Sequence, residues 1–248
     1  MKPRSERPAR VPRLYVETGL RPESRVELPA DAAHHATRVL RLSDGDAVVL
    51  FDGRGGEYDA RLAVPARGAA SAMTAARRDV ERESPLQVTL VQGVSSSDKM
   101  DFTVQKAVEL GVAAIQPVLT ARSVVRLQGE REAKKRAHWQ RIAVAACEQC
   151  GRNRVPEVAD PLPLDRYRAP AGASLLLLSP TGALRLGEAA PRSPLVLAVG
   201  PEAGFSEEEE EGLRRAGFAG VRLGPRVLRT ETAALAALAA LNALAGDY

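Results

Sequence analysis

The sequence LVLAVGPEAGFS, residues 195–206, joins a run of apolar residues to a turn that contains two glycines. The run 195–199 predicts a strand buried on both faces, as in a parallel sheet covered by helices. Gly200 and Gly204 allow close backbone approach, and open α/β sheets bind ligands at such strand ends. Ser206 and Glu209 have the spacing of a capping box that starts a helix. A ligand pocket and a plain strand-to-helix turn both fit this stretch.

The helix expected after Ser206 limits the kind of ligand. The positive end of its dipole faces the glycine turn, but Glu207, Glu208 and Glu209 already occupy its first turn, so a phosphate is disfavoured there. The sequence also contains neither a Walker loop nor a G-x-G-x-x-G pattern after a strand. A classical dinucleotide or Rossmann cofactor site is therefore not supported.

A similar arrangement follows near the carboxyl end. A short strand at 221–223 leads into GPRVLR, residues 224–229, and Thr230-Glu231-Thr232 opens the last helix. Arg226 and Arg229 lie close to this helix start, where cations are unfavourable beside the dipole. We expect them to act on Glu231 or on an anionic ligand; surface arginines without a partner are the alternative.

Strands and helices alternate after Pro85. Apolar runs predict further strands at 88–92, 114–118 and 175–178. Helical patterns predict helices from Ser97 or Asp98 to residue 110, at 130–150 and at 231–244. This alternation predicts an α/β domain with a mainly parallel sheet over residues 83–248.

The chain before Glu81 has a different pattern. Short strands are expected at 14–16, 26–28, 47–51, 58–64 and 73–80, around one helix at 31–40 with Asp31 as its cap. A small β-barrel or compact β-rich module over residues 13–82 fits this pattern. Residues 1–12 are expected to form a loose leader.

The charge balance permits an RNA partner without requiring one. The formal net charge is +4, and most of the positive charge is arginine, which holds phosphate bidentately and stacks on bases. A solvated arginine-rich surface explains the charge equally well. No apolar run approaches the ~20 residues of a membrane span, and the basic start has no apolar core. We therefore expect a cytoplasmic protein without membrane contact.

Two polar stretches were weighed as further sites. Cys147 and Cys150 have the spacing of a redox or zinc pair, but no second pair accompanies them, so packing and no metal are expected. In EQCGRN, residues 148–153, Gln149, Arg152 and Asn153 could clamp a nucleotide, and a helix cap followed by a loop fits equally well. The other candidates for RNA contact are Lys99, Lys106 and Arg122.

Taken together, these segments resemble the RsmE family, bacterial methyltransferases that make N3-methyluridine in 16S ribosomal RNA of the small subunit. The resemblance covers nearly the whole chain from Leu14, and it is specific in the order and spacing of its segments. These are HHATRVLR (34–41), FDGRGGEYDARL (51–62), KMDFTVQKAVELGVAAIQPV (99–118), RSVV (122–125), EQCGRNRVPEV (148–158), AVGPEAGFS (198–206) and LGPRVLRTETAALAAL (223–238).

The resemblance implies a fold, a cofactor and an assembly. Such proteins have an amino-terminal PUA-like β-barrel that helps to hold RNA, and a carboxyl-terminal SPOUT domain with a deep trefoil knot. The knot binds S-adenosylmethionine (SAM), and family members are homodimers. The implied cofactor residues are Leu178, Ser179, Gly200, Pro201, Glu202, Gly204, Leu223, Gly224, Arg226, Val227 and Leu228. One departure is Ala203-Gly204 in place of the common Gly-Gly, which is tolerable unless Ala203 needs a positive φ.

The resemblance also suggests a mechanism. A uridine imide is a weak nucleophile while protonated, so a base must take its proton or cations must stabilise the anion. Arg229 and Arg152 are the candidates for anion stabilisation, and Glu231 is a base or the orienter of an arginine. The target base in 16S ribosomal RNA or the small ribosomal subunit must be splayed out of its stack. Arg38 and Arg41, within HHATRVLR, join the candidates for RNA contact.

Two other functions stay open on the sequence. One is another SPOUT methyltransferase that acts on transfer RNA or on a ribose hydroxyl. The other is a non-catalytic RNA-binding factor for ribosome assembly.

Overall fold

The computed structural model describes residues 11–65, 69–123, 129–189 and 192–248. Most of the leader expected at residues 1–12 lies outside the described residues. The chain forms two compact units: residues up to Arg82 together with Cys147–Val155, and Glu83–Ala146 together with Pro156–Tyr248. The sequence analysis placed residues 147–155 in the carboxyl-terminal domain, whereas their contacts belong to the amino-terminal unit.

The amino-terminal unit contains a five-stranded sheet. Its strands are β1 (Arg13–Tyr15), β2 (Arg25–Glu27), β3 (Ala47–Phe51), β4 (Glu57–Ala63) and β5 (Ser71–Arg78), in the order β1-β3-β4-β5-β2. Among the pairings described for this sheet, only β1–β3 is parallel. Leu14, Leu50 and Leu62 are among the fully buried side chains of its core. The described pairings form an open path from β1 to β2, so they do not by themselves close the expected barrel.

The helix of this unit begins earlier than expected. Helix α1 (Ala30–His34) continues into a π-helical turn, η1 (His35–Val39). Its N-cap is Pro29 rather than Asp31, and the Pro29 carbonyl accepts the first helical bond from the Ala33 amide at 2.8 Å. Asp31 lies in the first turn, where a carboxylate favours the positive end of the helix.

The carboxyl-terminal unit contains an eight-stranded sheet in which every described pairing is parallel, as the sequence predicts. The order is β11-β13-β10-β12-β6-β7-β8, and β9 also pairs with β7. The strands are β6 (Val88–Gly93), β7 (Ala114–Leu119), β8 (Glu157–Val158), β9 (Leu162–Pro163), β10 (Ser174–Leu178), β11 (Leu184–Arg185), β12 (Leu195–Val199) and β13 (Ala219–Arg222).

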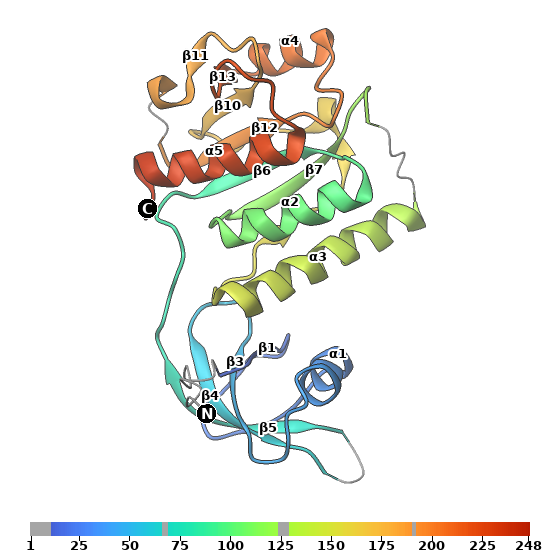
Figure 1. Cartoon of the computed structure of the whole chain (residues 1–248), viewed down its shortest axis with the longest axis vertical. Coiled ribbons are helices and arrows are strands. Elements are labelled where there is room, and N and C mark those ends of the chain that lie inside the picture. Colours follow the sequence, from blue (N-terminus) through green and yellow to red (C-terminus); the bar gives the residue numbers. More distant parts are fainter. Residues whose placement is uncertain (1–10, 66–68, 124–128, 190–191) are drawn as a thin grey trace, which may run out of the picture. The chain divides into compact units, whose positions relative to one another are not determined.

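Helices cover this sheet. They are α2 (Ser97–Glu109), α3 (Glu130–Cys150), α4 (Glu207–Arg215) and α5 (Thr230–Ala245), and α2 and α5 pack side by side (Figure 1). Val196 and Ala198 of β12 share a core cluster with Leu213 of α4, and all five residues of β12 are buried. The capping box of Ser206 and Glu209 is confirmed in α4. The N-cap of α2 is Ser96, whereas Ser97 or Asp98 was expected to cap this helix.

Strand β13 lies between two strands that follow each other in sequence. β10 and β11 both pair with β13 in parallel, so residues 179–183 must cross β13 to connect them. Gly182 makes this crossing possible, because a Cβ there would lie 2.5 Å from the Val221 carbonyl carbon. The Ser179 amide donates to the Val221 carbonyl at 3.0 Å, and Arg222 Nη1 donates to the Gly182 carbonyl at 2.6 Å. The loops that follow β10 and β13 are thereby held together.

Candidate cofactor site

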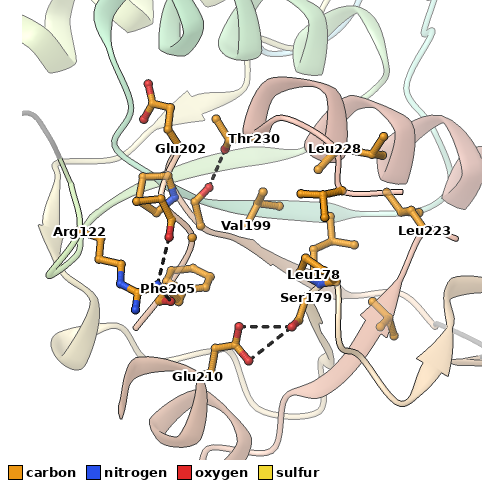
Figure 2. Close-up of a pocket in the computed structure, with 18 of the residues that line it drawn as sticks. Arg122, Leu178, Ser179, Val199, Glu202, Phe205, Glu210, Leu223, Leu228 and Thr230 are labelled. Carbon is orange, nitrogen blue, oxygen red and sulfur yellow. Dashed lines mark hydrogen bonds between the residues drawn. The ribbon is translucent and has the colours of Figure 1, made fainter. Parts of the chain in front are cut away.

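A pocket lies at the carboxyl ends of β10, β12 and β13 (Figure 2). Its volume is about 330 Å³, within the usual range for small-molecule sites. Three loops, 178–180, 199–205 and 223–228, form most of its wall, and Arg122, Glu210, Val221, Thr230 and Ala233 complete it. The crossing of β13 explains why loops distant in sequence meet here.

All eleven residues that the sequence analysis named for the cofactor line this pocket. Most of the other lining residues lie within two positions of a predicted site residue: Pro180, Val199, Ala203, Phe205, Val221, Thr230 and Ala233. Glu210 comes from helix α4 and had no signal in the sequence beyond its place in a glutamate run. Arg122 was expected to contact RNA, and the structure also places it in the wall of this pocket.

The loop from Gly200 to Phe205 is held at its start by helix α5. Thr230 Oγ1 donates a hydrogen bond to the Gly200 carbonyl at 2.6 Å. Thr230 Oγ1 in turn accepts one from Gln92 Nε2 at 3.0 Å. Gln92 is fully buried and Thr230 is 6 % exposed, so both bonds are shielded from water.

Glu202 anchors the middle of the same loop to helix α2. Its carboxylate accepts a hydrogen bond from the Ser96 amide at 3.0 Å and lies 3.3 Å from Lys99 Nζ. Burial acts to raise the pKa of Glu202, but the hydrogen bonds from Ser96, from its own backbone amide and from Lys99 outweigh burial and lower that pKa to about 2. Lys99, predicted to contact RNA, is thus engaged with the pocket loop.

Arg122 holds the end of the loop. Its Nη1 donates to the carbonyls of Ala203 at 3.2 Å and Phe205 at 3.1 Å (Figure 2). Gly204, between these two residues, has a φ of 70°, which favours glycine. Ala203 is not among the described non-glycine residues with positive φ. The methyl group that replaces the usual glycine therefore causes no backbone strain.

Ser179 and Glu210 form a polar group on the opposite wall. The Ser179 hydroxyl lies 3.3 and 3.4 Å from the two carboxylate oxygens of Glu210 and 3.1 Å from Thr181 Oγ1. Glu210 also binds Arg214 one turn further along α4. Apolar side chains, among them Leu178, Val199 and Leu228, also line the pocket (Figure 2).

Comparison with known proteins decides the family. An RNA methyltransferase domain family matches residues 82–242, and an RNA methyltransferase PUA domain family matches residues 28–72. The ribosomal RNA small subunit methyltransferase E of Bacillus subtilis is 32% identical over 226 residues, which cover 87% of this chain and 88% of the relative. The chain belongs to the ribosomal RNA small subunit methyltransferase E family.

Two solved structures are similar to this family member over almost the whole chain. The enzyme of this family from Neisseria gonorrhoeae, bound to S-adenosyl methionine, is 45% identical with a TM-score of 0.91, and the match covers 96% of this chain and 99% of that one. A Legionella pneumophila protein in complex with SAM is 39% identical with a TM-score of 0.92, covering 97% and 100%.

The residues proposed to act on the substrate of this methyltransferase family member differ in their surroundings. Arg226 and Arg229 are exposed, and neither forms an ion pair with any carboxylate in the described part of the chain. The alternative of an Arg229–Glu231 pair is therefore not seen. Glu231 Oε2 is buried and has no hydrogen-bond partner among the described residues.

The EQCGRN segment is mostly structural. Asn153 is fully buried; its Oδ1 accepts from Arg13 Nη2 at 2.6 Å and its Nδ2 donates to the Val80 carbonyl. The prediction that Asn153 contacts RNA is contradicted, because its amide is inaccessible and both ends are engaged. Arg152 is 4 % exposed and lies in the amino-terminal unit, whereas the pocket lies in the other unit. Gln149 is exposed.

The remaining predicted residues lie elsewhere. Arg38 and Arg41 are exposed in the amino-terminal unit, in or just after the π-helical turn. Lys106 forms an ion pair with Glu109 at 2.7 Å. Cys147 is fully buried, and its thiol lies 3.6 Å from the Arg154 carbonyl.

The described residues contain no helix with the length and apolarity needed to span a bilayer. They also contain no cluster of three or more histidine, cysteine, aspartate or glutamate side chains placed to hold a metal ion.

Proposed function

We propose that this protein transfers a methyl group from SAM to N3 of a specific uridine in 16S ribosomal RNA. The observation that carries the proposal is the pocket itself: three strand-end loops meet around one cavity, in a chain 45% and 39% identical to proteins solved with SAM bound. The name of the family supplies the RNA substrate of its relatives. Specificity for uridine N3 follows from the resemblance described above.

The residues present fit SAM. Leu178, Leu223 and Leu228 offer apolar surface for an adenine ring, and the glycines of the 200–204 loop keep backbone groups accessible. The carboxylate of Glu210 adds a negative charge to the wall that faces a cationic ligand. Ala203 adds no strain that would close the pocket.

The chemistry required of the chain is modest. Bound SAM supplies an electrophilic methyl group on a sulfonium. The protein must align the uridine nitrogen with that methyl group and stabilise the imide anion after its proton leaves. Arg229 is the first candidate for stabilising the anion, because it is exposed, borders the pocket loop 223–228 and has no carboxylate partner among the described residues.

Glu231 and Arg152 have supporting roles in this proposal. Glu231 follows Arg229 by two residues, and its buried, unpartnered Oε2 is available to accept a proton or to orient an arginine. Arg152 is a second cation for the uridine anion, together with RNA contacts from Arg38, Arg41 and Gln149. Because Arg152 is only 4 % exposed, it can act on the uridine only if RNA binding uncovers its guanidinium.

The proposal includes the division of labour and the assembly. Residues 13–82 form the PUA-like domain that holds RNA, and residues 83–248, apart from 147–155, form the SPOUT methyltransferase domain of a cytoplasmic homodimer. The crossing of β13 by residues 179–183 supports a trefoil knot in the second domain. The same crossing joins the cofactor loops.

The test offers purified protein and labelled SAM to deproteinised 16S ribosomal RNA and to intact small subunits from a strain lacking the enzyme. Nuclease mapping and mass spectrometry should find one N3-methyluridine. A methylated ribose, or label in transfer RNA only, would instead indicate another SPOUT activity. Absence of SAM binding by calorimetry would favour a non-catalytic assembly factor.

A further inference from the structure

Gln92 is a buried polar residue in a mostly apolar strand. It lies near the end of β6, where Leu90 and Val91 are fully buried, and its own side chain is fully buried as well. Its Nε2 donates two hydrogen bonds, to Thr230 Oγ1 at 3.0 Å and to the Gly93 carbonyl at 3.0 Å. An apolar side chain would fill this place without the cost of burying an amide. Stability alone therefore does not explain Gln92.

The bonds of Gln92 continue to the pocket with a fixed direction. A hydroxyl group has one proton, and Thr230 Oγ1 donates its proton to the Gly200 carbonyl at 2.6 Å. The same oxygen must then accept from Gln92. The relay Gln92–Thr230–Gly200 thus runs from the sheet interior to a residue in the pocket wall.

The relay joins the two loops that matter most to the proposed reaction. Gly200 begins the loop after β12, and Thr230 is the first residue of α5, directly between Arg229 and Glu231. The backbones also meet closely here: a Cβ on Gly93 would lie 2.5 Å from the Pro201 nitrogen. A small displacement of Thr230 would therefore shift the adjacent Arg229 relative to the pocket.

We infer that Gln92 and Thr230 are positioning residues, which hold the Gly200–Gly204 loop in register with the Arg229–Glu231 helix start. The inference rests on the proposed function. It adds Gln92 and Thr230 to the residues already proposed to bind the cofactor or to act on the uridine. The hydroxyl of Thr230 aligns the methyl donor in its pocket with the cation that stabilises the substrate anion. Misplacement of reacting groups by about 1 Å costs roughly a hundredfold in rate.

The decisive variant is Thr230→Val, which keeps the shape of the side chain and removes the hydroxyl. We expect kcat for methyl transfer to fall roughly tenfold to a hundredfold, with a smaller rise in KM for SAM. Thr230→Ser keeps the hydroxyl and should restore kcat to within a few-fold of the original enzyme. Gln92→Met keeps the length of the side chain but removes the Nε2 donor to Thr230, so it should also lower kcat.

Thr232→Val is the matched control, because Thr232 is exposed two residues further along the same helix. It should leave kcat unchanged, and thermal melts of all four variants separate folding from alignment. An unchanged kcat in Thr230→Val, or a Thr230→Ser variant as slow as Thr230→Val, overturns the inference. If Thr230→Val does not fold, Gln92→Met with full kcat overturns it. Failure of the unmodified protein to bind SAM overturns the proposed function, and this inference with it.

Discussion

Two short segments, 151–154 and 224–229, both begin with glycine and carry two arginines, but their surroundings differ. In the first, Arg82 binds the Gly151 carbonyl, Arg13 binds Asn153, and Arg154 pairs with Glu81. In the second, Arg226 and Arg229 are exposed and form no ion pair with the described carboxylates. Similar composition therefore places Gly151, Asn153 and Arg154 in the architecture of one unit, and it leaves Arg226 and Arg229 available to a substrate in the other.

The largest expected effect is a loss of stability on substitution of Glu57, whose arginine partners also hold residues 151–154. Glu57 is 1 % exposed and binds Arg13, Arg78 and Arg82, and Arg13 continues to Asn153. Glu57→Ala leaves Arg13 buried without its carboxylate, so we expect a loss of about 3–5 kcal/mol in the free energy of unfolding. Denaturant titration measures it.

Asp59→Ala is the control for this prediction, since Asp59 binds Arg78 from the exposed side of the same strand. It should cost less than about 1 kcal/mol. Burial acts to raise the pKa of Glu57, and the hydrogen bond and charge of Arg13 with the charges of Arg78 and Arg82 lower it overall. The stabilisation is therefore complete at neutral pH and is lost as the pH falls through the lowered pKa. Equal losses in both variants would contradict a structural role for the network.

In the second segment, 224–229, we expect a substitution to reduce activity and to leave stability nearly unchanged. Arg229→Ala removes the proposed stabiliser of the uridine anion, and we expect kcat to fall about 10²–10³-fold. Because Arg229 has no ion pair among the described residues, the melting temperature should change little. Arg215→Ala, an exposed arginine paired with Glu211 on α4, is the control and should keep full activity. Full activity in Arg229→Ala would show that the exposed arginine of segment 224–229 does not act on the substrate.

Much of the fold could be predicted because it depends on local pattern. The apolar run 195–199 became β12 with unchanged bounds, and the capping box of Ser206 and Glu209 formed as expected. The loops that the resemblance assigned to the cofactor lie together around one pocket, and their role in binding SAM stays a proposal.

What the sequence could not show depends on contacts between distant residues. Asn153 has the polarity of an RNA-contacting residue, and only its packing beside Arg13 shows that it is buried. Lys99 was expected to contact RNA, and its ion pair with Glu202 forms only because the fold brings the two residues together. The two-residue strands β8, β9 and β11 are too short for a periodic pattern, and the crossing of β13 depends on contacts between residues about 40 apart in sequence.

A smaller loss of stability than that of Glu57→Ala is expected from substitution of Glu202, which anchors the 200–205 loop of the pocket. Its pKa of about 2 lies below the ordinary value of 4.5, so its stabilisation is present above pH 4.5 and is lost as the pH falls toward 2. Glu202→Gln should therefore be less stable than the unmodified protein at pH 7, by about 1 kcal/mol given the partial exposure of the pair. The difference should vanish near pH 2, as followed by chemical denaturation at several pH values. A constant difference across that range would mean that charge is not what anchors the loop.

The smallest effect is expected at Ala203, one residue further along the same loop. Ala203→Gly restores the pair of glycines common in the family, and the bond from Arg122 is kept because it ends on the backbone carbonyl. Ala203 needs no positive φ, so glycine relieves no strain and only adds freedom to the unfolded chain. We expect a loss of about 0.4–1 kcal/mol in stability, with KM for SAM within twofold of the original value. A rise in SAM affinity of tenfold or more would show that the Ala203 methyl group obstructs the pocket. The conformation of the loop would then depend on residue 203 and not only on the contacts made by Thr230, Glu202 and Arg122.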